Sequence, residues 1–523
     1  MGHCDDPSRV GDPGSGDSRQ SGVSPDPPGS VSDSRKLELS AYLDRSKDRI
    51  LTTLCRWLSI PSISADPAHA ADLMASAEFC ARLMSEAGFQ KVEVLSAGEP
   101  AGPVGPGERG GPGGSRSSRS TGGPGCPTVY GEHLGAGPSA LTVLIYGHHD
   151  VQPADPLEQW SSPPFEPTVV DDQVRARGAS DDKGQVLMQI EATRGLLACH
   201  DRLPVNVKLL VEGEEEVGSP HLGALLARNR ERFSADVVVV SDTTMLAPEV
   251  PSTTVSMRGL VAFDVTLRTA KSDLHSGIWG GTVPNAALLA ARLAGSLHDS
   301  EGKVTLPGFY DRVRELTQEE AEFLAKVPFD ARRYRDEAGV AYLEGEAGRS
   351  PLERTGARPT AEVVGIHAGY GGPGMKTVVP AVANLKLALR LVPDQRPDEV
   401  EEALRAWLRQ RVPTGAELSV TRYGGVAALV TPFGHSAVKA VSRALERVWG
   451  REVIFTREGG SGPEEALGRL LGAPVIALGV GLPTDNFHAP NERLVLRQLW
   501  LGILAAGELL VELGSLKPSR APA

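Results

Sequence analysis

Four short apolar runs constrain the fold of this chain more than any other feature of its sequence. They read ALTVLIYG at 140–147, VNVKLLVE at 205–212, ADVVVVSD at 235–242 and APVIALGVG at 473–481. Each run is largely apolar at successive positions, which is typical of strands that are buried on both faces. Helical patterns separate the runs. Together they predict an α/β fold with a mostly parallel sheet flanked by helices.

The stretch from about Val261 to Gly425 has a different pattern. Apolar and polar residues alternate in VAFDVTL and LKLALRLVP, and helical patterns occur in NAALLAARLAGSL and PDEVEEALRAWLRQRV. Alternation indicates strands with one buried face. We therefore expect an α+β domain over residues 259–430, inserted into a first domain that residues 37–258 and 431–515 form together.

Three segments contain too few apolar residues to be packed in a core. They are residues 1–36, the Gly, Pro and Ser-rich residues 96–127, and residues 516–523. Such compositions cannot bury enough apolar surface to offset the entropy of the chain. We expect a disordered tail at each end and a surface insertion at 96–127.

Charge and cysteine usage exclude several classes of partner. The formal net charge is -12 and no Lys/Arg cluster occurs, which argues against nucleic acid. No apolar run is long enough for a membrane span, and no signal peptide pattern is present. The five cysteines show no CxxC spacing, which fits free thiols in a reducing compartment. We expect a cytoplasmic protein without a membrane or nucleic acid partner.

Histidines and acidic residues follow the apolar runs, where ligands of open α/β sheets gather. Taken singly, an Asp before a helix is usually an N-cap and a Glu triplet is usually a solvated face. Here five segments place such residues at the same predicted sheet edge, which indicates a metal site. The segments are GHHD, RGASDDKG, EGEEEVGS, VVSD and LPTDNFHAPNE, which contain His148, Asp150, Asp181, Glu215, Glu216, Asp242 and His488.

The donor types predict two metal ions and a general base. Two histidines and three carboxylates, one of them shared, could hold two divalent ions that remain open to water. A spare carboxylate would take a proton from a bridging water and return it to a leaving amine. Mixed nitrogen and oxygen ligands suit zinc first, with manganese or cobalt as alternatives.

These motifs, together with DLHSG, KTVVP, LRLVP and REGGS, resemble the cytosolic non-specific dipeptidases and carnosinases. The wider group of co-catalytic zinc peptidases includes succinyl-diaminopimelate desuccinylase, aminoacylase and glutamate carboxypeptidase. The motifs occur in family order from about Leu37 to Glu512. The resemblance implies a catalytic domain with an inserted lid that also carries a homodimer contact.

The resemblance also implies a role for each motif residue. His148 and Asp242 would hold one metal, Glu216 and His488 the other, and Asp181 would bridge them, with a cis peptide bond after it. Glu215 would be the general base and Asp150 the acid behind His148. In the lid and the last motif, His275 would stabilise the oxyanion in the partner subunit's site, and Thr377, Arg390 and Ser461 would bind substrate.

The stretch YGHHDVQP then assigns different roles to its two histidines. If the strand continues to residue 150, His148 and Asp150 project to one side and His149 to the other. A carboxylate on the second ring nitrogen commonly orients an imidazole that ligates a metal. We therefore expect His148 to be the ligand, Asp150 to orient it, and His149 to be replaceable.

A few residues depart from the family pattern. Tyr423 in RYGGVAA stands where the dipeptidases often have a histidine, so its role is left unassigned. Gly462 and Glu464 stand where cytosolic dipeptidases tend to have apolar residues. These changes predict an altered pocket rim and an altered substrate preference.

The expected function is that of a metal-dependent dipeptidase. It would hydrolyse a short peptide with a free C-terminal carboxylate, using a hydroxide that bridges the metals and Glu215 as base. Arg390 fits this substrate because a planar guanidinium forms a bidentate pair with a carboxylate. One alternative keeps the dimetal site and changes the substrate to an N-acyl amino acid. A more remote alternative is a non-catalytic metal-binding protein, although every expected catalytic position is filled.

Overall fold

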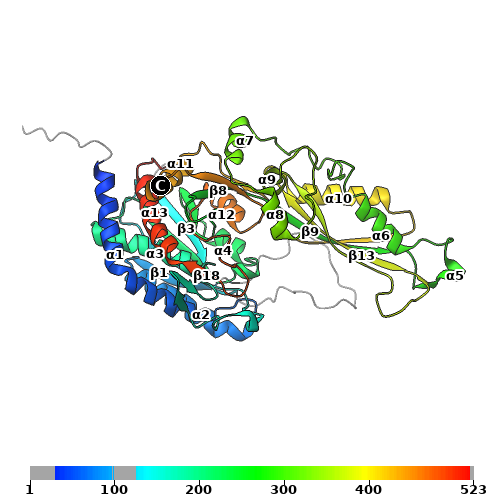
Figure 1. The fold of residues 1–523 in the computed structure, drawn as a ribbon, viewed down its shortest axis with the longest axis horizontal. Helices are drawn as coiled ribbons and strands as arrows, with labels where there is room; N and C mark the ends of the chain where they lie inside the picture. The colour runs from blue at the N-terminus through cyan, green and yellow to red at the C-terminus, as the bar shows by residue number, and fades with distance from the viewer. Residues whose placement is uncertain (1–29, 97, 99–124, 519–523) are drawn as a thin grey trace, which may run out of the picture.

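The computed structural model describes residues 30–96, 98 and 125–518 and shows two lobes (Figure 1). The large lobe contains the N-terminal half of the chain and the C-terminal helices. The small lobe is built by residues 259–426. The predicted insertion at 96–127 lies mostly outside the described residues, as do residues 1–29 of the predicted N-terminal tail and 519–523 of the C-terminal one. Among the described residues, no helix has both the length and the apolar character needed to cross a bilayer.

A six-stranded sheet forms the centre of the large lobe, in the order β1-β2-β6-β3-β7-β17. The four apolar runs of the sequence form the four neighbouring strands β6, β3, β7 and β17, and each of these pairs is parallel. Two further strands extend the sheet with antiparallel pairs. The bounds are β1 (Lys91–Ser96), β2 (Pro127–His133), β3 (Thr142–His148), β6 (Asn206–Glu212), β7 (Val237–Val240) and β17 (Val475–Ala477).

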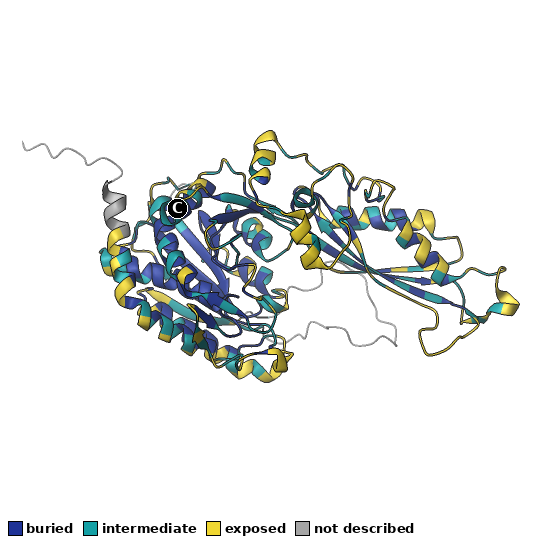
Figure 2. Cartoon of the chain, in the orientation of Figure 1, coloured by how far each residue is buried: buried dark blue, intermediate teal, exposed yellow. Residues whose placement is uncertain are grey.

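Helices cover both faces of this sheet and bury its strands (Figure 2). Both β6 and β7 are buried at every position; β7 is wholly apolar, and β6 is apolar except at Asn206, Lys208 and Glu212. The central helix α3 (Lys183–Cys199) is buried along nearly its whole length. One face carries α3 with α1 (Ser30–Leu58), α2 (Ala70–Glu86), α11 (Ser436–Trp449) and α13 (Leu496–Gly514), and the other carries α4 (Leu222–Arg228) and α12 (Glu464–Leu471).

The first helix corrects one detail of the predicted tail. We expected disorder through residue 36, because the apolar period begins at Leu37. In the structure α1 already begins at Ser30. Polar residues can extend a helix that is anchored by its later turns, since propagation is far easier than nucleation.

The small lobe contains a four-stranded antiparallel sheet in the order β11-β13-β9-β14. Burial alternates strictly along β9 and β13, as the sequence pattern predicts. The buried face packs against α6 (Ala286–Gly295) and α10 (Pro397–Arg411) to form a core of its own. The strands are β9 (Gly259–Arg268), β11 (Thr360–Ala368), β13 (Val382–Leu391) and β14 (Glu417–Val426).

The remaining elements connect the lobes or decorate them. Two small sheets belong to the large lobe and contain β15 (Leu429–Val430), β8 (Ser252–Met257) and β16 (Ile454–Glu458), and β18 (Arg493–Val495), β5 (Gln173–Arg175) and β4 (Thr168–Val170). The small lobe adds β10 (Leu274–His275), α5 (Ser276–Trp279), α8 (Ala331–Ala338) and β12 (Val378–Val379). Two further helices, α7 (Gln318–Ala325) and α9 (Pro351–Gly356), contact β16 of the large lobe. Three 3-10 turns are η1 (Pro67–His69), η2 (Leu157–Gln159) and η3 (Glu215–Val217).

Candidate metal centre and catalytic site

The carboxyl ends of the parallel strands bring the predicted metal ligands to one edge of the large sheet. His148 is the last residue of β3, and Asp242 follows β7. Glu215 and Glu216 open the η3 turn after β6. The other two predicted ligands lie on adjoining segments, with Asp181 just before α3 and His488 in the loop after β17. The peptide bond between Asp181 and Asp182 is cis.

Asp181 lies between the two histidines, with one carboxylate oxygen toward each. Its Oδ1 atom is 2.9 Å from Nε2 of His148, and its Oδ2 atom is 2.9 Å from Nε2 of His488. Asp242 Oδ2 lies 3.5 Å from Nε2 of His148, and Glu216 Oε2 lies 3.2 Å from Nε2 of His488. Two sets of one histidine and one carboxylate therefore share Asp181.

The charges and donor types of these groups fit two divalent cations. The candidate donor atoms form two groups of three, and within each group they lie no more than 4.8 Å apart. Across the described part of the chain, no Lys or Arg forms an ion pair with any carboxylate of these groups, so only the imidazoles offset their negative charge. The groups are His148, Glu215 and Asp242, and Asp181, Glu216 and His488.

Asp150 supports both the histidine ligand and the glutamates. It is fully buried, and its Oδ1 atom lies 3.4 Å from Nδ1 of His148. The same carboxylate accepts hydrogen bonds from the backbone N–H groups of Glu215, at 3.2 Å, and Glu216, at 3.1 Å. Nδ1 of His148 also lies 3.1 Å from the backbone carbonyl oxygen of Asp150, which the sequence did not predict, and neither did it predict the hydrogen bonds to the glutamate amides. Asp150 thereby fixes the η3 turn relative to β3.

His149 points away from the metal groups. It is fully buried, and its Nε2 atom lies 2.8 Å from the carbonyl oxygen of Pro127 at the start of β2. Burial lowers the pKa of His149 to about 4, so the ring is neutral near pH 7. Its place in the structure is that of a core residue, and its removal would leave a cavity without removing a metal donor.

The carboxylates around the two imidazoles favour their protonated forms. Burial disfavours a charged His148, but hydrogen bonds to the neighbouring carboxylates outweigh this effect and raise its pKa well above its usual value. Hydrogen bonds to Asp181 and Glu216 raise the pKa of His488 to about 10. A proton and a metal ion compete for the same nitrogen, so metal binding near neutral pH must release protons.

Glu215 has the environment expected of a tuned acid–base group. Burial raises the pKa of its carboxyl to about 9, and nearby Asp242, Glu216 and Asp150 add to this effect, whereas His148 opposes it. A positive charge close to Glu215 lowers the pKa of its carboxyl and so favours the carboxylate form. With a pKa of about 9 the Glu215 carboxyl is protonated near pH 7, so it would serve as a base only when cations at the neighbouring donor groups lower that pKa.

Two residues that the sequence analysis did not single out hold the ligands in place. Gln152 donates from its side chain to Oε2 of Glu216 at 2.8 Å, and its backbone N–H bonds to Oε1 at 3.1 Å. Glu492 is fully buried and accepts hydrogen bonds from the backbone N–H groups of Ser180, at 3.0 Å, and Asp181, at 3.1 Å. Gln152 lies in the stretch HHDVQP and Glu492 in HAPNE, so their position beside predicted ligands was the sequence feature that could have identified them.

Two of the predicted substrate-binding residues lie where the lobes meet. Arg390 donates from Nη1 to Oγ of Ser461 at 3.0 Å. Ser461 also lines a cavity of about 380 Å³ together with Glu215. Tyr423 and Gly462, two of the departures from the family pattern, lie in the wall of the same cavity. The predicted base and a predicted substrate residue therefore face one space.

His275 and Thr377 lie elsewhere, at the far end of the small lobe beside α5 (Figure 1). His275 pairs with Val378 between β10 and β12, and the N–H of Ser276 donates to the carbonyl oxygen of Thr377 at 3.0 Å. Both predicted site residues are exposed. The fold of one chain does not bring them to its own candidate metal ligands.

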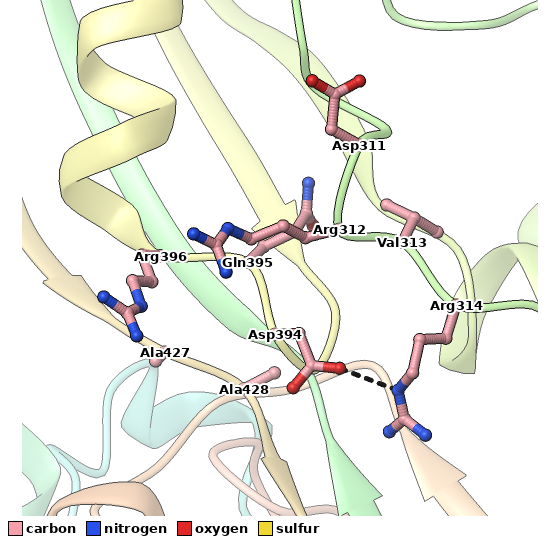
Figure 3. A pocket seen from close by; sticks show the side chains of 9 residues that line it. All are labelled: Asp311, Arg312, Val313, Arg314, Asp394, Gln395, Arg396, Ala427 and Ala428. Atoms are coloured by element: carbon pink, nitrogen blue, oxygen red, sulfur yellow. Dashed lines mark ion pairs between the residues drawn. The ribbon is translucent and has the colours of Figure 1, made fainter.

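A separate cavity of about 520 Å³ lies near the return from β14 to the large lobe (Figure 3). Ala427 and Ala428 line it, and several charged side chains surround it. Arg314 pairs there with Asp394, at 2.7 Å between Nε and Oδ2. None of the predicted catalytic or binding residues lies in its wall.

Comparisons with known proteins agree with this geometry. The profile of the family described as Peptidase family M20/M25/M40 matches residues 144–512. A human protein named Beta-Ala-His dipeptidase is 30% identical over 90% of each chain, and the Cys-Gly metallodipeptidase dug1 of Schizosaccharomyces pombe is 31% identical over 92% of this chain and 99% of its own. The solved M20 family metallo-carboxypeptidase Sso-CP2 of Sulfolobus solfataricus has a TM-score of 0.75 at 31% identity, over 89% of this chain and 99% of its own. The resemblance inferred from the motifs is confirmed.

Proposed function

The chain belongs to the peptidase family M20/M25/M40, and from this premise we propose that it is a metal-dependent dipeptidase acting on short peptides with a free C-terminal carboxylate. The placement of Asp181, with one oxygen toward each of two histidines, is the observation that carries the proposal. The names of the human and fission yeast relatives support the substrate class.

Two divalent ions would be held by two pairs of residues, with Asp181 shared between them. His148 and Asp242 would hold one ion, and Glu216 and His488 the other. When bound, such ions acidify a water molecule and polarise the scissile carbonyl. The mixed nitrogen and oxygen donors favour zinc, with manganese and cobalt as alternatives.

Residues of the chain supply positioning and proton transfer. Arg390 binds the terminal carboxylate, and Ser461, which accepts its hydrogen bond, fixes the guanidinium. Glu215 takes a proton from the attacking water and delivers it to the leaving amine. Asp150 holds the backbone of Glu215 and the ring of His148, so the base and the ligand keep a fixed relation.

A panel of substrates tests this function. Simple dipeptides such as Ala-Ala should be hydrolysed by the metal-loaded protein, whereas N-acetyl and N-succinyl amino acids should be cleaved at least about tenfold more slowly in kcat/KM. Longer peptides in the same panel separate a dipeptidase from a carboxypeptidase. Hydrolysis of only the acyl compounds, measured by released amino acid, would identify a deacylase instead.

The position of His275 and Thr377 supports a homodimer with shared sites. Both residues are exposed at the tip of the small lobe, where Trp279 of α5 is also exposed. The outer strand β11 presents Val364 and Ile366 to solvent, 62% and 50% exposed, beside an unpaired strand edge. Covering such an edge with a second copy is a common way to satisfy it. We propose that the tip of each subunit completes the site of its partner, in a protein that we expect to be cytoplasmic.

Mixed dimers test the shared site. His275→Ala and Glu215→Gln should each be nearly inactive alone. After random mixing, activity should return to about one quarter of the wild-type value, because half of the dimers are hybrids and each hybrid has one complete site of two. Hydrolytic activity is measured after subunit exchange. As the control, each variant alone is taken through the same exchange. Sites that work within single subunits would show no recovery.

A further inference from the structure

A second arginine lies beside Arg390 in a large cavity. The cavity has a volume of about 970 Å³, and both Arg258 and Arg390 line it. Arg258 stands between β8 and β9, where the chain passes from the large lobe to the small one. Arg390 pairs across the sheet with Leu260 of β9 on one side and with Thr360 of β11 on the other. Both guanidinium groups thus belong to the same end of the small-lobe sheet.

Arg258 is held rigidly by backbone carbonyls. Its Nε donates to the carbonyl oxygen of Gly459 at 3.3 Å, and its Nη1 donates to those of Arg354, at 3.2 Å, and Arg358, at 3.4 Å. No hydrogen bond from its Nη2 is formed within the described residues. A Cβ atom at residue 459 would lie 3.0 Å from Nη2, so glycine at this position leaves the group room. The anchored side chain therefore keeps donors available.

Neither arginine forms an ion pair with a carboxylate in the described part of the chain. Of the other guanidiniums of the cavity, Arg358 pairs with Glu346 at 2.7 Å, whereas Arg354, like Arg258, donates to carbonyl oxygens. Acidic residues also line the cavity, namely Asp299, Glu301, Glu344, Glu346 and Glu362. Of these, Glu362 on β11 acts on Arg258 most directly, and it is exposed and makes no ion pair with Arg258.

Two adjacent cations without anions are unfavourable when they are partly buried. Burial lowers the pKa of Arg258 to about 10, and the charge of Arg390 adds to this effect, whereas Glu362 opposes it. Anionic oxygens placed between the two guanidinium groups would offset the repulsion between their charges and the loss of hydration on burial. One terminal carboxylate is matched by the guanidinium of Arg390, and Nη2 of Arg258 is left as a charged donor for a second anion.

We propose that Arg258 binds a second carboxylate of the substrate, so that the enzyme prefers dipeptides with Asp or Glu at the C-terminal position. The inference rests on the proposed function, in which Arg390 takes the terminal carboxylate. In an acidic C-terminal residue, the two carboxylates are separated by a short aliphatic chain, which suits two arginines that line one cavity. The neutral amides Asn and Gln have the same shape and lack the charge.

Matched dipeptides test the preference directly in the wild-type protein. The kcat/KM for Ala-Glu should exceed that for Ala-Gln at least about tenfold, and Ala-Asp should exceed Ala-Asn in the same direction, because a fixed guanidinium discriminates strongly against a group that cannot pair with it. A wild-type ratio near one would overturn the inference and leave the dipeptidase function intact. Failure to hydrolyse any dipeptide would instead overturn the proposed function.

Variants then assign the preference to Arg258. In Arg258→Met the Ala-Glu to Ala-Gln ratio should fall to near one, and Arg258→Lys, which keeps the charge without the fork, should give an intermediate ratio. Arg354→Met is the matched control, because this guanidinium lines the same cavity and binds only carbonyls, so the wild-type ratio should persist. If Arg258→Met kept a tenfold ratio of kcat/KM for Ala-Glu over Ala-Gln, another group would bind the second carboxylate. Should Arg258→Met fail to fold, the wild-type and Arg258→Lys ratios still decide the matter.

Discussion

Glu215→Gln is expected to reduce kcat on dipeptides by about 100-fold to 10,000-fold while the protein still binds two metal ions. The amide keeps the size of the side chain but cannot accept and return a proton, and general acid–base catalysis contributes a factor of this order. The five predicted ligands are unchanged in this variant, although the Glu215 carboxylate also lies in one of the two candidate donor groups. Metal content by mass spectrometry and steady-state kinetics on Ala-Ala measure the two properties separately.

Glu214→Gln provides the matched control, one residue away. Glu214 is also buried, but its carboxylate accepts hydrogen bonds from the backbone N–H groups of His221, at 2.8 Å, and Cys126, at 3.1 Å. We expect this variant to keep kcat within a few-fold of wild type, as an amide oxygen can accept one of these bonds. If Glu215→Gln kept wild-type kcat, another group would be the base. If it lost its metals, Glu215 would be a ligand.

Asp181→Asn is expected to weaken metal binding by at least about 100-fold and to abolish hydrolysis. An amide offers one acceptor oxygen, so it cannot present an oxygen toward both His148 and His488 as the carboxylate does. Outer partners of metal ligands already contribute 10-fold to 100-fold in affinity, and a shared ligand should contribute more. Titration of zinc against a competing chelator measures the affinity of each site.

The neighbouring Asp182 gives the control for this substitution. Its Oδ2 atom accepts hydrogen bonds from the backbone N–H of His148, at 3.1 Å, and from Oγ of Ser241, at 3.4 Å. The side-chain oxygen of an asparagine can accept both, so Asp182→Asn should bind two metals with affinity close to wild type. Equal metal affinities in Asp181→Asn and wild type would contradict the shared ligand.

The sequence predicted the centre of the large sheet because the relevant strands are apolar on both faces. The runs around Ile145, Leu209, Val239 and Ile476 became the four parallel strands. The strands β1 and β2 were missed, because the edge strand β1 is partly exposed and neither strand has a continuous apolar run. The start of α1 was also misplaced, since its first turns carry no apolar period.

In the candidate site, the sequence predicted which residues come together but not the hydrogen bonds that hold them. Histidines and acids at strand ends could be predicted to meet, because parallel strands end at one sheet edge. The hydrogen bonds from the Glu215 and Glu216 amides to Asp150, and from the Asp181 amide to Glu492, depend on the path of each loop. The resemblance implied that His275 acts in the partner subunit's site, and the structure places His275 beside α5 at the far end of the small lobe (Figure 1).

Hydrolysis of Ala-Ala before and after metal removal tests the central claim most directly. The protein is stripped with a chelator, titrated with zinc, and assayed for released alanine together with the bound metal per subunit. We predict negligible activity in the stripped protein and recovery that is complete when two ions are bound per subunit. Full activity without metal, or none on dipeptides when both sites are filled, would contradict the account of this chain as a dimetal dipeptidase.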